Sequence, residues 1–363
     1  MREPDALLTL GTACVTPYSV LMALGALLAC LLTLALCRKS IGTERGVSLC
    51  ACTVAGAVLG GHIVYVLCMF NYFASGLMLV FKPWLGGYTL YGAVLGGLCA
   101  ALVYARVTKQ SFATLCDLLA PGAALAIAIG RAAEAFTDQG LGEYVDAEAL
   151  QFFPIAVRDS YGDFRMPVFA WEALAALVIL AVVLSMRGKR RAGERAEVML
   201  TLLGVSQIFL EQIRRDDYLR FGFVRFTQLA AIIVIAAVMA LRILRSIRGG
   251  GAGAWTYVRT ALLLVGVLVV IFIEFAFEKP QFMPVLRVCI ALLGALCMAS
   301  LLTLRGRGAV VGALCALIAA LTVAVLVPLH MALVWENDLL LGVMALALAA
   351  IAATVLIDGK RAE

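Results

Sequence analysis

Long apolar stretches alternate with short polar segments along almost the whole chain. A helix that crosses a bilayer needs about 20 mostly apolar residues, so the pattern predicts an all-α polytopic membrane protein. The sixth stretch is the weakest candidate, because it is short and contains Gln207, Glu211 and Gln212. The stretches lie at 15–37, 47–69, 87–105, 113–130, 167–186, 197–213, 226–244, 256–278, 284–304, 308–329 and 338–357.

The composition favours the same class. Hydrophobic residues make up 64% of the chain and charged residues only 14%, with a mean hydropathy of +1.02. A soluble globule of this composition lacks the polar surface that water requires. The net charge of +6 follows from basic residues at helix ends, and nucleic acid is not expected as a partner.

Lys and Arg gather in alternate connecting segments, among them 38–45, 106–109 and 187–195. Short loops rich in these residues stay on the cytoplasmic side, which predicts an outer N-terminus and a cytoplasmic C-terminus. Two arginine groups break this rule on the outer side. Placing an arginine at the centre of a membrane helix costs about 2.5–3.5 kcal/mol of insertion free energy. Both groups are therefore expected to pair with other residues and to serve the function of the protein. They are Arg131, Arg158 and Arg165, and Arg214, Arg215, Arg220 and Arg225.

A glycine-rich segment, 249–255, divides the chain and has the composition of a flexible linker. Residues 1–248 contain nearly every polar residue of the apolar stretches, whereas residues 256–363 form a predicted C-terminal transmembrane extension of unknown role. No internal repeat is visible, so an inverted-repeat transporter is not favoured.

The eleven cysteines lie in or beside apolar stretches, without a CxxC pair or Cys/His ligand spacing. Neither a disulfide framework nor a metal site is expected from that pattern. The first apolar stretch has no convincing cleavage site, so no cleavable signal peptide is expected.

Polar residues recur near the outer ends of five of the first six predicted helices, all but the second. Their convergence is independent of the count of basic residues and indicates one site at the outer interface. They are Tyr18, Tyr91, Arg131, Glu134, Glu172, Glu211 and Arg214.

The segment DLLAPGAALAIAIGRAAEAFTDQGLG resembles the signature of the prolipoprotein diacylglyceryl transferases, D-x-x-AP followed by GR-x-GN-F-x-N-x-E-x-x-G. Five positions match it at full spacing: Asp117, Pro121, Gly130, Arg131 and Gly142. The resemblance extends from about Pro17 to Arg248. It implies a seven-helix transferase-like transmembrane core, and the apolar pattern adds about four extra transmembrane helices after it.

Other family motifs are similar in the same order. PYSVLMALG resembles the first-helix aromatic motif, with Tyr18 at its tyrosine, and MPVFAWEAL keeps the glutamate of P-S-Q-L-Y-E as Glu172. SQIFLEQIRRDD is similar to the E-x-x-R-x-x-D segment, with Glu211 and Arg214. These four residues, together with Gln139 and Gly142 of the signature, are the expected substrate-binding residues.

The chain also departs from the family pattern. Glu134 replaces the signature asparagine, Gln139 replaces its acidic residue, and Tyr91 stands where many members have a functional histidine. Leu203 and Gln207 stand where members often have a tyrosine and an arginine.

The resemblance implies transfer of the diacylglyceryl group of phosphatidylglycerol to the lipobox cysteine thiol of a prolipoprotein signal peptide, with glycerol 1-phosphate leaving. It implies no cofactor. The planar guanidinium of arginine suits phosphate oxygens, so Arg131 is the expected phosphate contact and Arg214 the second. Only a thiolate attacks well, which makes Glu134 or Tyr91 the expected base.

The residues leave alternatives open. Glu134, one turn after Arg131, could serve only as its salt-bridge partner, and Glu172 could likewise pair with an arginine. The whole chain could be a non-catalytic relative that binds anionic lipid or lipoprotein. A lipid transporter is a third alternative, but the inner halves of the helices are almost uniformly apolar.

Overall fold

The computed structural model describes residues 7–10, 13–74, 76–186, 191–215, 219–221 and 224–248, together with the isolated residues 261 and 265. The chain divides into two compact units. The first comprises residues 1–199 and 213–230, and the second comprises residues 200–212 and 231–363.

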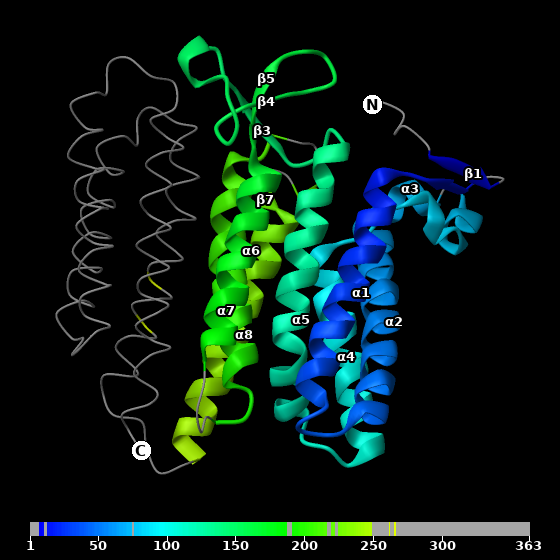
Figure 1. Ribbon diagram of the computed structural model, residues 1–363, viewed down its shortest axis with the longest axis vertical. Coiled ribbons are helices and arrows are strands. Elements are labelled where there is room, and N and C mark those ends of the chain that lie inside the picture. The colour runs from blue at the N-terminus through cyan, green and yellow to red at the C-terminus, as the bar shows by residue number, and fades with distance from the viewer. Residues whose placement is uncertain are drawn as a thin grey trace. The chain divides into compact units, whose positions relative to one another are not determined.

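Five long helices form the described body of the first unit (Figure 1). All five are long and apolar enough to cross a membrane, and between 17% and 44% of each span is buried within the protein. Exposed side chains such as Leu27, Leu59 and Leu174 cover much of the remainder, as expected for helices that face lipid. The helices are α1 (Pro17–Cys37), α2 (Thr43–Cys68), α4 (Leu90–Thr108), α5 (Phe112–Ala133) and α6 (Val168–Ser185).

Two further helices correspond to the sixth and seventh predicted stretches. They are α7 (Glu194–Ile213) and α8 (Phe226–Arg248). In the second unit they pack closely, since a Cβ on Gly204 would lie 2.7 Å from Cγ1 of Ile235. An all-α polytopic membrane protein is therefore confirmed. Apart from Ala261 and Val265, the four stretches from 256 to 357 and the linker before them lie outside the described residues and stay predictions.

Polar side chains set where the helices begin. Thr16 and Ser19 form a capping box at the start of α1, with each side chain bonded to the other's backbone N–H. Thr89 accepts a hydrogen bond from Gly92 N and starts α4 three residues later than the hydrophobic pattern predicted. The delay has a local cause, because Gly86 and Gly87 have φ angles of +93° and +88° and cannot belong to a helix.

Glycine allows α2 and α4 to approach closely along their length. A Cβ on Gly96 would lie only 2.1 Å from the carbonyl oxygen of Gly56, and a Cβ on Gly60 would lie 2.5 Å from that of Gly92. The GAVLGG segments of both helices thus form a backbone-to-backbone contact of the small-residue type. In α5, Gly122 similarly faces Thr33 of α1.

The bundle has a head end, at which α1, α4 and α6 begin and α2 and α5 end. A three-stranded antiparallel sheet lies there, in the order β3-β5-β4 (Figure 1). Short elements complete this end. They are β1 (Leu8–Leu10), β2 (Ala13–Val15), α3 (Phe70–Ala74), η1 (Leu77–Phe81), η2 (Pro83–Leu85), η3 (Glu134–Phe136), β3 (Leu141–Tyr144), η4 (Glu148–Leu150), β4 (Val157–Arg158), β5 (Phe164–Pro167), β6 (Arg220–Phe221) and β7 (Val224–Arg225).

At the opposite end, α5 supports the first turn of α7. Both carboxylate oxygens of Asp117 accept hydrogen bonds from that turn, one from Gly193 N at 2.7 Å and the other from Ala196 N at 3.1 Å. The carboxylate thus occupies the place of an N-cap side chain, although it comes from a different helix. The first residue of the family signature therefore has a structural task.

Candidate functional site

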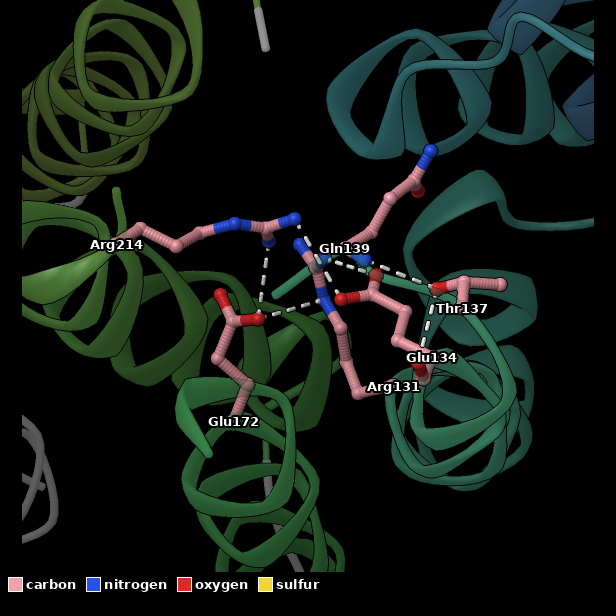
Figure 2. A network of polar contacts seen from close by, with 6 residues as sticks. All are labelled: Arg131, Glu134, Thr137, Gln139, Glu172 and Arg214. Carbon is pink, nitrogen blue, oxygen red and sulfur yellow. Dashed lines mark hydrogen bonds and ion pairs between the residues drawn. The ribbon is translucent and has the colours of Figure 1, made fainter. Parts of the chain in front are cut away.

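Two arginines and two glutamates meet at the head end in a closed ring of alternating charge (Figure 2). We call Arg131, Glu134, Arg214 and Glu172 the charge ring. Arg131 donates from Nη1 to Oε1 of Glu134 at 2.6 Å, and its Nε lies 3.3 Å from Oε2 of Glu172. Arg214 donates from Nη1 to the same Glu172 oxygen at 3.2 Å, and its Nη2 lies 3.5 Å from Oε2 of Glu134.

The ring is almost completely buried. The exposed fractions of its side chains are 11% for Arg131, 9% for Glu134, 4% for Arg214 and 0% for Glu172. Burial of so many charges is tolerated only when each has a partner, and removal of one partner from such a pair costs about 3–5 kcal/mol. The predicted salt-bridge partnerships of Glu134 and Glu172 are therefore confirmed.

Local structure brings the four residues together. Arg131 lies in the last turn of α5, where a cation is favoured by the helix dipole, and Glu134 follows in η3. Glu172 comes from the second turn of α6. Arg214 follows the last residue of α7, and its backbone carbonyl accepts a hydrogen bond from the buried guanidinium of Arg225.

The loop after Glu134 is held against the ring. Thr137 Oγ1 donates to the carbonyl of Glu134 at 2.9 Å, and Gly140 O accepts from Phe169 N at the start of α6. Gly140 has a φ of +71°, and a Cβ there would lie 2.4 Å from Oε2 of Glu134. Only glycine permits both this backbone conformation and this approach. Gly140 was not predicted as a site residue. The only indication in the sequence was that a glycine stands at this position.

The structure brings Tyr18 near the ring but not Gln139. Tyr18, in the first turn of α1, is half-buried and within electrostatic reach of Glu134, Arg131 and Arg214. Gln139 is exposed, and its side chain points away from Glu172 and Arg214 (Figure 2).

Gly142 is a buried residue of β3, where a Cβ would lie 2.9 Å from the carbonyl oxygen of Ile213. Leu141 O accepts a hydrogen bond from Arg215 N. β3 therefore packs on the segment that contains Arg214, which gives Gly142 a structural reason to be small. Tyr91 is buried in the first turn of α4, and Glu211 is buried in the last turn of α7 and belongs to the second unit. Their roles stay predictions.

A separate cavity of about 170 Å³ lies beside the end of α2. Aromatic residues and His62 line it, and no charge-ring residue does. Both ring nitrogens of His62 face backbone carbonyls, Nδ1 at 3.1 Å from Gly87 and Nε2 at 2.9 Å from Val80. A neutral imidazole donates from only one of its nitrogens, so His62 connects α2 to the segment that precedes α4 through the carbonyl that its tautomer selects.

Comparison with known proteins decides the family. A model of the family described as prolipoprotein diacylglyceryl transferase matches residues 5–244. The chain belongs to the prolipoprotein diacylglyceryl transferase family. The matched residues include the whole charge ring and every expected site residue, and they agree with the resemblance carried by the sequence motifs.

Relatives in the family are bacterial proteins named phosphatidylglycerol–prolipoprotein diacylglyceryl transferase. The chain is 31% identical to that of Clostridium kluyveri over 223 residues, which cover 60% of this chain and 87% of the relative. It is 28% identical to that of Streptococcus pneumoniae serotype 4 over 242 residues, or 65% of this chain and 91% of the relative. A protein of Acaryochloris marina is 31% identical over 190 residues, or 50% of this chain and 68% of the relative.

Proposed function

We propose that this protein transfers the diacylglyceryl group of phosphatidylglycerol to the lipobox cysteine thiol of a prolipoprotein. The reaction takes place at the outer face of the bacterial cytoplasmic membrane, with the N-terminus outside and the C-terminus in the cytoplasm. The charge ring is the observation that carries the proposal, because it puts two arginines at the head end of a membrane bundle. Family membership supports the reaction, and the distribution of basic residues supports the orientation.

Arg131 and Arg214 bind the phosphate of the lipid. Their guanidinium groups converge on Glu172 from different elements, so both face one small region. Each guanidinium has five N–H donors in a rigid plane, and a phosphate can accept from several of them at once. Tyr18 lies beside this region and contributes to the lipid-binding surface.

Glu134 accepts the proton of the substrate thiol. A free cysteine has a pKa of about 8.5, so little of it is thiolate at neutral pH, and a positioned carboxylate can take the proton as the sulfur attacks. Oε1 of Glu134 is held by Arg131, which fixes the side chain, and Oε2, whose contact with Arg214 is much longer, is the proton acceptor. This arrangement combines the salt-bridge role with general-base catalysis.

The reaction moves one proton from the substrate thiol to the leaving group. The thiolate sulfur forms a bond to the glyceryl carbon of the lipid, and the bond from that carbon to the phosphate oxygen breaks with its electron pair on oxygen. The proton held by Glu134 passes to the departing glycerol 1-phosphate, which restores the carboxylate. Arg131 and Arg214 stabilise the charge that develops on the leaving oxygen without reorganisation.

A non-catalytic relative that binds anionic lipid is the second candidate. The observation that favours it is the pair of substitutions at Tyr91 and Glu134, where family members often have histidine and asparagine. A protein of this kind would keep the arginines and the lipid but transfer nothing.

The test uses the purified protein in detergent with labelled phosphatidylglycerol and a lipobox peptide. Transfer of label to the peptide cysteine, absent when that cysteine is replaced by serine, is expected. Lipid binding without any transfer would reject the transferase and favour the second candidate.

A further inference from the structure

The four contacts of the charge ring are unequal. Charge-assisted N–H···O bonds are usually about 2.7–2.9 Å long, and the Arg131–Glu134 contact is even shorter, at 2.6 Å. The contacts of Glu172 are longer, at 3.2 and 3.3 Å. The contact from Arg214 Nη2 to Oε2 of Glu134 is the longest, at 3.5 Å. This contact is the weakest link of the ring.

Oε2 of Glu134 is also the least satisfied oxygen of the ring. It is buried, and no residue in the described part of the chain donates a hydrogen bond to it. A buried acceptor without a donor is unfavourable, since the atom has lost its water and gained little in return. Among the carboxylate oxygens of the ring, Oε2 of Glu134 therefore has the most to gain from a change of partner.

An arriving phosphate must compete with the two glutamates for the same arginines. Glu172 is fully buried, and its Oε2 contacts both Arg131 and Arg214, so its displacement would break two contacts. Displacement of Glu134 from Arg214 breaks only the 3.5 Å contact, and Oε1 keeps its bond to Arg131. Glu134 is therefore the carboxylate that an arriving phosphate displaces more easily.

We propose that Glu134 is a displaceable anion that pairs with Arg214 until the phosphate of the lipid replaces it. The inference rests on the proposed function. Release from Arg214 turns Oε2 into the proton acceptor for the thiol, so the base is prepared only after the lipid has bound. Lipid binding thus precedes thiol deprotonation, and the site does not activate a cysteine when no lipid is present.

The proposal separates this chain from relatives with an amide at the same position. An asparagine has no negative charge with which to compete for Arg214. Glu134 gives this chain a base, but the same charge weakens its affinity for an anionic lipid. A carboxylate-to-amide substitution should therefore change binding and turnover in opposite directions.

The experiment measures binding of phosphatidylglycerol to the purified full-length protein in detergent, without peptide. Glu134→Gln should bind the lipid about tenfold more tightly than the natural chain, because a competing charge has been removed. Glu143→Gln is the matched control, since it removes an exposed carboxylate that pairs with Arg215 in the same part of the protein. Its affinity should equal that of the natural chain. Equal or weaker binding by Glu134→Gln would overturn the proposal.

Glu134→Asn provides a second variant if the glutamine side chain does not fit. Should neither amide variant give folded protein by size-exclusion chromatography, Glu134 is a structural member of the ring and the proposal fails. The transfer assay on the natural chain is read separately. Tighter binding by the amide variants, with no transfer by the natural chain, would reject the proposed transferase activity but support the role of Glu134 as a displaceable anion. Transfer by the natural chain, with unchanged lipid affinity in the amide variants, would support the transferase activity and reject the displaceable anion.

Discussion

Arg131 and Arg214 share a single carboxylate oxygen, Oε2 of Glu172, although they come from the end of α5 and from the residue after α7. Two cations that share one buried anion must lie close together. Such an arrangement prepares a site for a second anion, because the repulsion between the arginines has already been overcome during folding.

Replacement of Glu172 by glutamine should destabilise the protein strongly. The substitution leaves two buried arginines without their shared anion, and the expected loss is about 3–5 kcal/mol. Glu143→Gln removes a pair whose side chains are 38–45% exposed, and should cost no more than about 1 kcal/mol. Unfolding in detergent, followed by intrinsic fluorescence, measures both. Similar losses would show that burial of the ring does not govern its contribution.

Arg131→Ala should abolish the use of phosphatidylglycerol. Loss of one preorganised donor to a developing oxyanion lowers the rate by about 10²–10³-fold, and the phosphate also loses a ground-state contact. Arg158→Ala is the control, because Arg158 is an exposed residue of β4 that stacks on Phe164. The measurement is the rate of diacylglyceryl transfer at several lipid concentrations. Unchanged lipid dependence in Arg131→Ala would remove this residue from the site.

Gly140→Ala should reduce transfer much more than Gly162→Ala. Both glycines have positive φ angles, +71° and +92°, so both substitutions cost about 1–2 kcal/mol of backbone strain. Only at Gly140 does the new Cβ meet Oε2 of Glu134, whereas nothing lies within 4 Å at Gly162. The new Cβ at position 140 would also lie 2.7 Å from Cβ of Phe169, so the ratio of the two transfer rates reports the displacement of Glu134 and of the start of α6 together. A ratio near one would mean that Glu134 tolerates movement.

Gly96→Ala should disrupt the contact of α2 with α4, while Gly97→Ala should not. The Cβ at position 96 would lie 2.1 Å from Gly56 O, but the Cβ at position 97 would approach nothing closer than 3.8 Å. Forced repacking costs about 1–3 kcal/mol or more. Thermal unfolding of the two variants in detergent measures the difference. Equal melting temperatures would show that the helices separate without penalty.

The apolar pattern was sufficient to predict the long helices, because about 20 apolar residues in sequence have few other stable arrangements. Local spacing also predicted the pairing of Arg131 with Glu134, one turn apart. It could not show that Glu172 joins Arg131 to Arg214, because these residues lie far apart in the chain and only packing unites them. The motif resemblance indicated all four residues of the charge ring, but only their arrangement in space shows that the contacts between them differ in length.

The family signature also suggested that Gln139 and Gly142 face the substrate, and it gave no geometric reason for either. Gly142, a residue of β3, packs against the backbone carbonyl of Ile213 just before Arg214, and the side chain of Gln139 is exposed. The task of Gly140 depends on a positive φ angle, which a sequence pattern does not reveal. Motif positions therefore identified the region, whereas individual tasks depended on backbone conformation.

Helix α5 is linked to both ends of α7. Asp117 of α5 accepts hydrogen bonds from the first turn of α7, and Arg131 of α5 shares Oε2 of Glu172 with Arg214, the residue after α7. A helix advances about 1.5 Å and turns about 100° with each residue. Insertion of one residue between Asp117 and Arg131 would therefore move one end out of register with the other. The tip of the head near Tyr161, which is 79% exposed, has no such restriction and is the natural place to insert a label or an affinity tag.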